Sequence, residues 1–124
     1  MMTTPLNQPL KTSTTSTRGV RVVVLEGDLD GTSAGLAQSA VSGAVQSSDN
    51  VVVDLSGVHY MSSAGLRVML LLYREAQCCG ARVAVVGLSA DLALLMKATG
   101  FLGFFHVADS TEAGIELLCS EAAW

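Results

Sequence analysis

The chain has 124 residues, of which 50% are apolar and 15% charged, and its formal net charge is −4. This length suits one domain with its own hydrophobic core, and the apolar content excludes a chain that is disordered over most of its length. An acidic chain without a basic cluster lacks the cations that neutralise phosphate groups. We therefore expect neither nucleic-acid binding nor direct membrane binding.

Three further sequence features favour a cytoplasmic protein. The N-terminus has no apolar leader segment, and no apolar stretch approaches the ~20 residues that a membrane-spanning helix needs. The cysteines Cys78, Cys79 and Cys119 are odd in number, and their spacing fits no zinc site. We expect three reduced thiols that pack as small hydrophobic side chains, with no disulfide, no bound metal and no cofactor.

Residues 1–18 differ in composition from the rest of the chain. Six of the seven residues in Thr12–Arg18 are Ser or Thr, and two prolines lie just before them. This segment is either a flexible tail or a polar edge strand, because threonine favours strands. We place the remaining domain at residues 19–124.

From residue 20 onward, apolar runs separated by turn residues predict alternating strands and helices. The predicted strands are 20–26, 51–55, 82–86 and a short one at 104–107. The predicted helices are 34–46, 64–79 and 113–121, with a further helix before the last of these. That helix begins at Ser89 or Asp91 and runs to about residue 98. Gly80 falls where a left-handed residue ends the second helix. This order predicts an α/β fold in which a mostly parallel sheet of four or five strands packs against about four helices.

Sites on such sheets lie where strands end and helices begin, which directs attention to Gly27–Ser33 and His59–Arg67. In the second segment, Ser62 or Ser63 opens a helix whose free N–H groups and positive dipole end favour a phosphate. Gly65 in the first turn permits close approach of another backbone. The simpler interpretation of these residues is a serine N-cap followed by a small residue for tight packing.

The segment Asp54–Arg67, with the sequence DLSGVHYMSSAGLR, resembles the signature of STAS domains and more narrowly that of bacterial anti-anti-sigma factors. Three other segments match the same family in order. Gly27–Asp30 resembles its G-E-L-D turn, Gly80 followed by the run at 82–86 resembles its G-x-x-φ-x-φ strand, and Leu94–Phe101 resembles its third-helix segment. The resemblance covers about residues 19–118, and the fixed order of the segments makes it specific.

This resemblance implies a regulator that switches partners and that has no catalytic residues. In the family, the unphosphorylated protein binds a serine kinase that is also the anti-sigma factor. Phosphorylation blocks this binding, and a PP2C-type phosphatase reverses it. The acceptor serine precedes a small residue, Gly and Leu, which here identifies Ser63. The best-known members have Asp before that serine, whereas this chain has Ser62, so Ser62 remains the alternative acceptor.

The family fold has a front edge strand, which favours that interpretation of part of residues 6–18. It also places the turn at Gly27–Ser33 beside Ser63. We expect Asp28 and Asp30 to be exposed there and to bind the kinase, while a solvated turn is the simpler interpretation. The remaining residues of the expected partner surface are Ser62, Gly65, Leu66 and Arg67.

Two other functional hypotheses remain. The same serine segment suits a STAS-type accessory subunit of a membrane transport complex that lacks a phosphorylation switch. A phosphate-accepting receiver domain is the third hypothesis, because Asp54 ends a buried strand. A receiver also needs a lysine after a later strand, whereas Lys97 falls within a predicted helix. No nucleophile with a histidine base is indicated, so we expect no enzyme.

Overall fold

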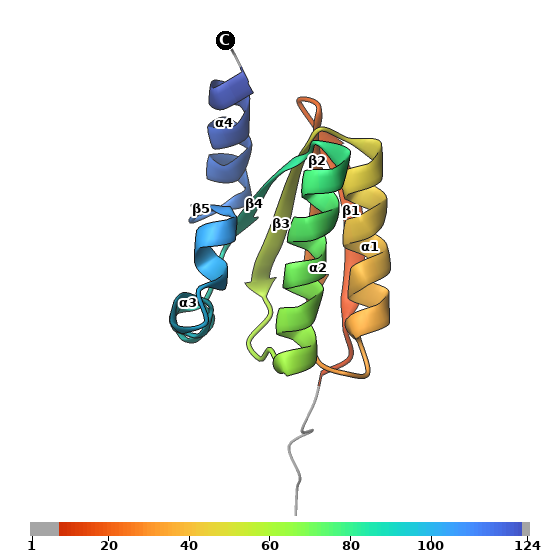
Figure 1. Cartoon of the computed structure of the whole chain (residues 1–124), viewed down its shortest axis with the longest axis vertical. Helices are drawn as coiled ribbons and strands as arrows, with labels where there is room; N and C mark the ends of the chain where they lie inside the picture. Colours follow the sequence, from red (N-terminus) through yellow and green to blue (C-terminus); the bar gives the residue numbers. More distant parts are fainter. Residues whose placement is uncertain (1–7, 123–124) are drawn as a thin grey trace, which may run out of the picture.

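The computed structural model describes residues 8–122 as a mixed sheet with helices on both of its faces (Figure 1). The elements are β1 (Lys11–Thr17), β2 (Val20–Glu26), α1 (Ala34–Ser47), β3 (Asn50–Gly57), α2 (Ser63–Cys79), β4 (Arg82–Val86), α3 (Ala90–Ala98), the 3-10 helix η1 (Phe101–Phe104), β5 (His106–Ala108) and α4 (Thr111–Ala122). The strand order is β1-β2-β3-β4-β5, with β1 antiparallel to β2 and all other neighbours parallel. The predicted α/β fold class is confirmed.

Strand β1 decides between the two interpretations of the Ser/Thr-rich segment. Its seven residues all pair with β2, so this part of the chain is a polar edge strand. Nearly all of its side chains are exposed, which is why a run of Ser and Thr suits it. Arg18 and Gly19 both have positive φ and turn the chain back into β2. Residues 1–7 of the predicted N-terminal segment lie outside the described part of the chain.

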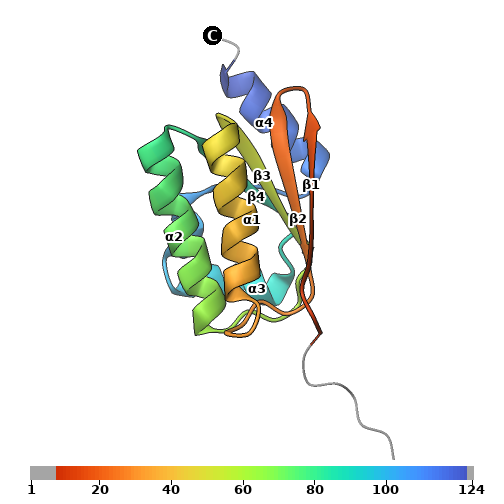
Figure 2. The same cartoon turned by 90° about the vertical axis from the view of Figure 1, so that its right-hand side faces the viewer.

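One face of the sheet is covered by α1, α2 and α3. Each of these helices joins two neighbouring parallel strands, and all three connections advance in the same direction across the sheet. Because such connections are right-handed, they place their helices on the same face. Figure 2 shows α1 and α2 side by side there. Their aliphatic side chains, among them Val41, Met69 and Met96, form one core with the inward residues of the strands.

Helix α4 covers the opposite face, where Ile115 and Leu118 pack against Val22, Val52 and Val86 (Figure 2). The central strand β3 is therefore buried on both sides. A strand buried on both sides needs apolar residues at successive positions rather than at alternate ones. This explains the unbroken valine run from which β3 was predicted.

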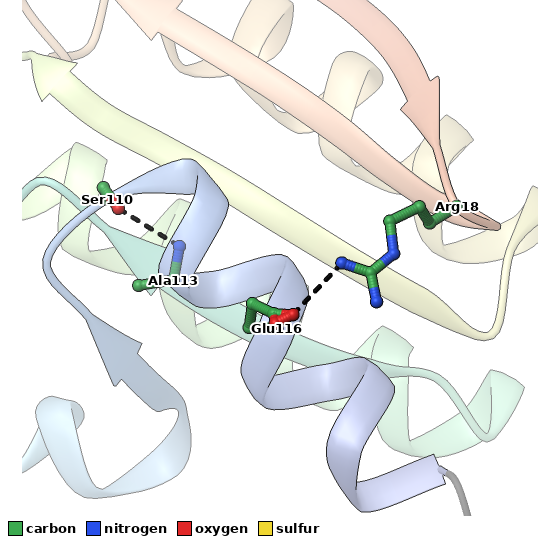
Figure 3. A network of polar contacts seen from close by, with 4 residues as sticks. All are labelled: Arg18, Ser110, Ala113 and Glu116. Atoms are coloured by element: carbon green, nitrogen blue, oxygen red, sulfur yellow. Dashed lines mark hydrogen bonds and ion pairs between the residues drawn. The ribbon is translucent and has the colours of Figure 1, made fainter.

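Two hydrogen bonds lie around the start of α4. The Thr111 hydroxyl donates to Asp54 Oδ2 at 3.0 Å, and the Ala113 N–H donates to Ser110 Oγ at 3.1 Å. Further along the helix, Arg18 and Glu116 form an ion pair at 3.2 Å (Figure 3). Both of these side chains are more than half exposed, so the ion pair adds little stability, and the position of α4 rests mainly on its apolar face.

The strand predicted at 104–107 is wrong in its bounds. The chain first forms η1, and β5 covers only three residues. Phe104, the first residue of the predicted strand, stacks on aromatic rings outside it: the ring centroids of Phe104 and Tyr73 lie 4.6 Å apart, and those of Phe101 and Phe104 lie 5.7 Å apart. Phe104 therefore packs against α2 from the 3-10 helix and does not begin a strand.

The expected packing of the cysteines is confirmed only in part. Cys119 is partly buried and lies against the core beneath α4. Cys78 and Cys79 are exposed at the end of α2, immediately before Gly80, which has a φ of 74° and ends the helix as predicted. The prediction that these two thiols pack as hydrophobic side chains is wrong, because Ala76 is the last residue of α2 that is buried.

Candidate functional site

The candidate site lies at the ends of β2 and β3, where two loops lead into α1 and α2. An isolated parallel bridge joins Leu29 in the first loop to Met61 in the second. The Leu29 N–H donates to the Tyr60 carbonyl at 3.0 Å, and the Ser62 N–H donates to the Leu29 carbonyl at 2.9 Å. The two segments selected from the sequence are therefore hydrogen-bonded to each other in the fold.

Gly65 allows the two loops to pack closely at this junction. It is buried, and a Cβ atom at this position would lie 2.6 Å from the Leu29 carbonyl oxygen and 2.6 Å from Met61 Cγ. The prediction that Gly65 allows another backbone to approach is confirmed, but that backbone belongs to the same chain. Its expected place on an exposed partner surface is wrong, because the Leu29 loop covers it.

The two adjacent serines have different structural roles. The Ser62 side chain caps α2, with its Oγ accepting from the Ala64 N–H at 3.2 Å, and the Ser62 carbonyl accepts from the Leu66 N–H at 3.0 Å. Ser63 is the first helical residue and its side chain is exposed. Within residues 8–122 its hydroxyl has no hydrogen-bond partner. The simpler cap interpretation thus applies to Ser62, which leaves the Ser63 hydroxyl accessible.

Asp28 differs from the expectation that both acids of the first loop are exposed. It is only 8% exposed, and its Oδ2 accepts from the backbone N–H of Gln8 at 2.9 Å. The Asp28 N–H in turn donates to the Gln8 carbonyl at 2.9 Å, and the Ser33 hydroxyl donates to the Asp28 carbonyl at 2.8 Å. Asp28 therefore ties the start of the described chain to the loop, and its side chain is not available on the surface.

We expect Asp28→Ala to lower the free energy of unfolding by about 1 kcal/mol, because the Gln8 N–H loses its acceptor. Asp30→Ala serves as the matched control in the same loop, and we expect it to change stability less. Urea unfolding of both variants measures this difference. A smaller loss for Asp28→Ala than for Asp30→Ala would contradict the role assigned to Asp28.

Asp30 is the more accessible acid and folds the loop locally. Its Oδ1 accepts from the hydroxyl of Thr32 at 2.7 Å and from the Thr32 N–H at 2.9 Å. The hydroxyl of Thr32 is the main cause that holds the pKa of Asp30 below its usual value of 3.8. Folding thus favours the charged carboxylate. This contribution is present above pH 3.8 and is lost as the pH falls through the lower folded-state pKa.

A shallow surface hollow lies directly beside Ser63. Its lining comes from the start of α2 and from η1: Ser63, Ala64, Leu66, Arg67, Leu70 and Phe101. Leu66, which we expected on the partner surface, lines the hollow but is half-buried and also packs on the main core. Arg67 is exposed. Phe101 was not predicted at this site, because local residue spacing does not show that η1 lies beside α2.

Asp54, the residue behind the receiver hypothesis, is held by structural hydrogen bonds. Its Oδ1 accepts from the Ser56 hydroxyl at 2.7 Å, and its Oδ2 accepts from Thr111. Lys97 lies on α3 and is exposed. The side chain of Asp54 thus joins β3 to α4 and has no role in the hollow beside Ser63.

In the described part of the chain, no group of three or more His, Cys, Asp or Glu side chains is placed to hold a metal ion. Between residues 8 and 122, no helix is both long enough and apolar enough to cross a membrane.

The profile of the STAS domain matches residues 11–114. The chain therefore belongs to the STAS domain family. BtrV from Bordetella bronchiseptica, a protein named as an anti-sigma factor antagonist, is 30% identical over 96 residues, which make up 77% of this chain and 83% of BtrV. This relative confirms the resemblance to anti-sigma factor antagonists that the sequence motifs indicated.

Solved structures of the same class share the fold. An anti-sigma factor antagonist from Mycobacterium paratuberculosis superposes with a TM-score of 0.78 at 23% identity, covering 88% of this chain and 93% of that one. The anti-sigma factor antagonist SpoIIAA in its unphosphorylated form gives a TM-score of 0.72 at 18% identity, covering 90% of this chain and 97% of SpoIIAA. At these identities the likeness concerns the fold alone.

Proposed function

We propose that this chain works as a partner-switching anti-sigma factor antagonist. With Ser63 unmodified, it binds an anti-sigma factor that is also a serine kinase. Phosphorylation of Ser63 by that kinase releases it, and a PP2C-type phosphatase restores the binding form. The observation that carries this proposal is the position of Ser63, whose exposed hydroxyl opens α2 beside the hollow.

The hydrogen bonds of the serine pair support Ser63 over Ser62 as the acceptor. The Ser62 oxygen already accepts the N–H of Ala64, and transfer of a phosphate to it would replace that cap. The Ser63 hydroxyl can meet a kinase active site without breaking a bond within residues 8–122. Its phosphate would lie in the favourable field of the α2 N-terminus, so the fold should change little.

The hollow explains how such a phosphate would act on the partner. Apart from Ser63 and Arg67, its lining side chains are apolar, which suits a docking surface between two proteins. A phosphate adds about −1.5 to −2 charges at its rim. Asp30 and Arg67 are the charged side chains of the expected partner surface that remain accessible, and we assign them to kinase recognition. A cytoplasmic location follows from such a partner.

Capture of partners from the native cell tests this function. The wild-type chain, Ser63→Ala and Ser63→Asp are each immobilised, and bound proteins are identified by mass spectrometry. We expect a serine kinase with wild type and with Ser63→Ala, and its loss with Ser63→Asp. A transport permease captured equally by all three chains would contradict the proposal and favour the accessory-subunit hypothesis.

A further inference from the structure

Arg67 lies four residues after Ser63, about one helical turn further along the same side of α2. Both side chains are exposed and both line the hollow. Residues four apart on a helix have Cβ atoms about 5–6 Å from each other. Because side chains on a helix lean toward its N-terminus, a residue at position 67 can reach back toward position 63.

Within residues 8–122, no carboxylate forms an ion pair with Arg67. The ion pair found among residues 8–122 joins Arg18 to Glu116, and the first turn of α2 has no acidic residue. Glu75 lies two turns further along α2, where its carboxylate accepts from the Ser42 hydroxyl at 2.7 Å and from the Gln46 amide at 2.6 Å.

The loops that adjoin the start of α2 add four further titratable side chains. Asp28 is buried in the first loop, and Tyr60 is exposed in the second. Asp30 lies in the first loop, with its carboxylate bound by Thr32, and His59 is exposed in the second loop. Among the residues that line the hollow itself, Arg67 is the charged one. A new anion on Ser63 would therefore meet Arg67 as its nearest cation along α2.

We propose that Arg67 receives the phosphate of Ser63 within the same chain, and that phosphorylation thereby withdraws this guanidinium from the partner surface. The inference rests on the proposed switch at Ser63. Guanidinium and phosphate form strong charge-assisted hydrogen bonds. The pair would change from +1 to about −0.5 or −1 in charge. The kinase would then lose a cationic contact at the same moment as it meets a new anion.

The test uses phosphoserine installed at position 63 during translation, so that neither kinase nor partner is needed. The second pKa of this phosphate is measured by ³¹P NMR in the otherwise wild-type chain, in Arg67→Gln and in Arg67→Lys. Arg74→Gln is the matched control, since Arg74 is an exposed arginine on the same helix, three turns from Ser63. Removal of an ion-pairing cation should raise the phosphate pKa by roughly 0.2 to 0.4 units.

We expect that rise in Arg67→Gln, a smaller one in Arg67→Lys, and none in Arg74→Gln. A titration of Arg67→Gln that superposes on that of the wild-type background would overturn the inference, as would an equal rise in Arg74→Gln. Because the phosphoserine is incorporated during translation, this result is independent of whether a cellular kinase modifies Ser63. Failure of the proposed function and failure of this inference are thus separate outcomes.

Discussion

Ser63→Asp should weaken binding of the partner kinase more than a hundredfold, while Ser63→Ala should bind like the wild-type chain. Ser63 borders a hollow with mostly apolar lining, so docking would strip water from the new carboxylate. Taking a charge out of water in this way costs several kcal/mol, and each ~1.4 kcal/mol lowers affinity tenfold. Isothermal titration calorimetry with the purified kinase measures the two dissociation constants.

The matched control for this prediction is the neighbouring serine. Ser62→Ala should lower the free energy of unfolding by about 1 kcal/mol through loss of the N-cap, yet keep its affinity for the kinase. Thermal unfolding of Ser63→Asp should stay close to that of the wild type, because a negative charge suits the first turn of a helix. Equal affinities for Ser63→Asp and Ser63→Ala would show that this surface is not the docking surface.

Gly65→Ala should lower the free energy of unfolding by about 2 kcal/mol, although alanine is the better helix former. The added methyl group would lie 2.6 Å from the Leu29 carbonyl oxygen. That oxygen cannot move freely, since it also accepts the N–H of Ser62 at 2.9 Å. Overpacking therefore disturbs the bridge between the two loops that position Ser63.

Gly43→Ala on α1 separates this clash from the general effect of glycine in a helix. A Cβ at Gly43 meets no atom within 4 Å, so there we expect a gain of up to about 1 kcal/mol. Guanidinium unfolding of the two variants gives the comparison. If both alanine variants are stabilised, the close packing assigned to Gly65 is incorrect.

The architecture could be predicted because its signals are local. Valine runs identify the inner strands, and the predicted bounds of β2 and β4 match the structure. Gly80 ends α2 with the left-handed conformation that its position indicated. The prediction near residue 104 failed because aromatic residues favour strands on average, whereas here Phe104 stacks on Tyr73 from another element.

The candidate site was predictable only where its chemistry depends on neighbours in the chain. Ser63 followed from the motif, and the cap at Ser62 followed from its place before the helix. The burial of Asp28 depends on Gln8, 20 residues away in the sequence, and that of Gly65 depends on the loop at Leu29. Phe101 reaches the hollow only through the turn after α3. The spacing of residues within a short segment predicts none of these long-range contacts.

The central claim is that Ser63 is the residue through which a kinase controls this protein. Phosphosite mapping by mass spectrometry, after incubation of the wild-type chain, Ser62→Ala and Ser63→Ala with the captured kinase and ATP, tests it most directly. We predict phosphate on Ser63 in the wild-type chain and in Ser62→Ala, and none in Ser63→Ala. Phosphate on Ser62 alone, or no phosphate on either serine with a kinase shown to be active, would contradict the claim.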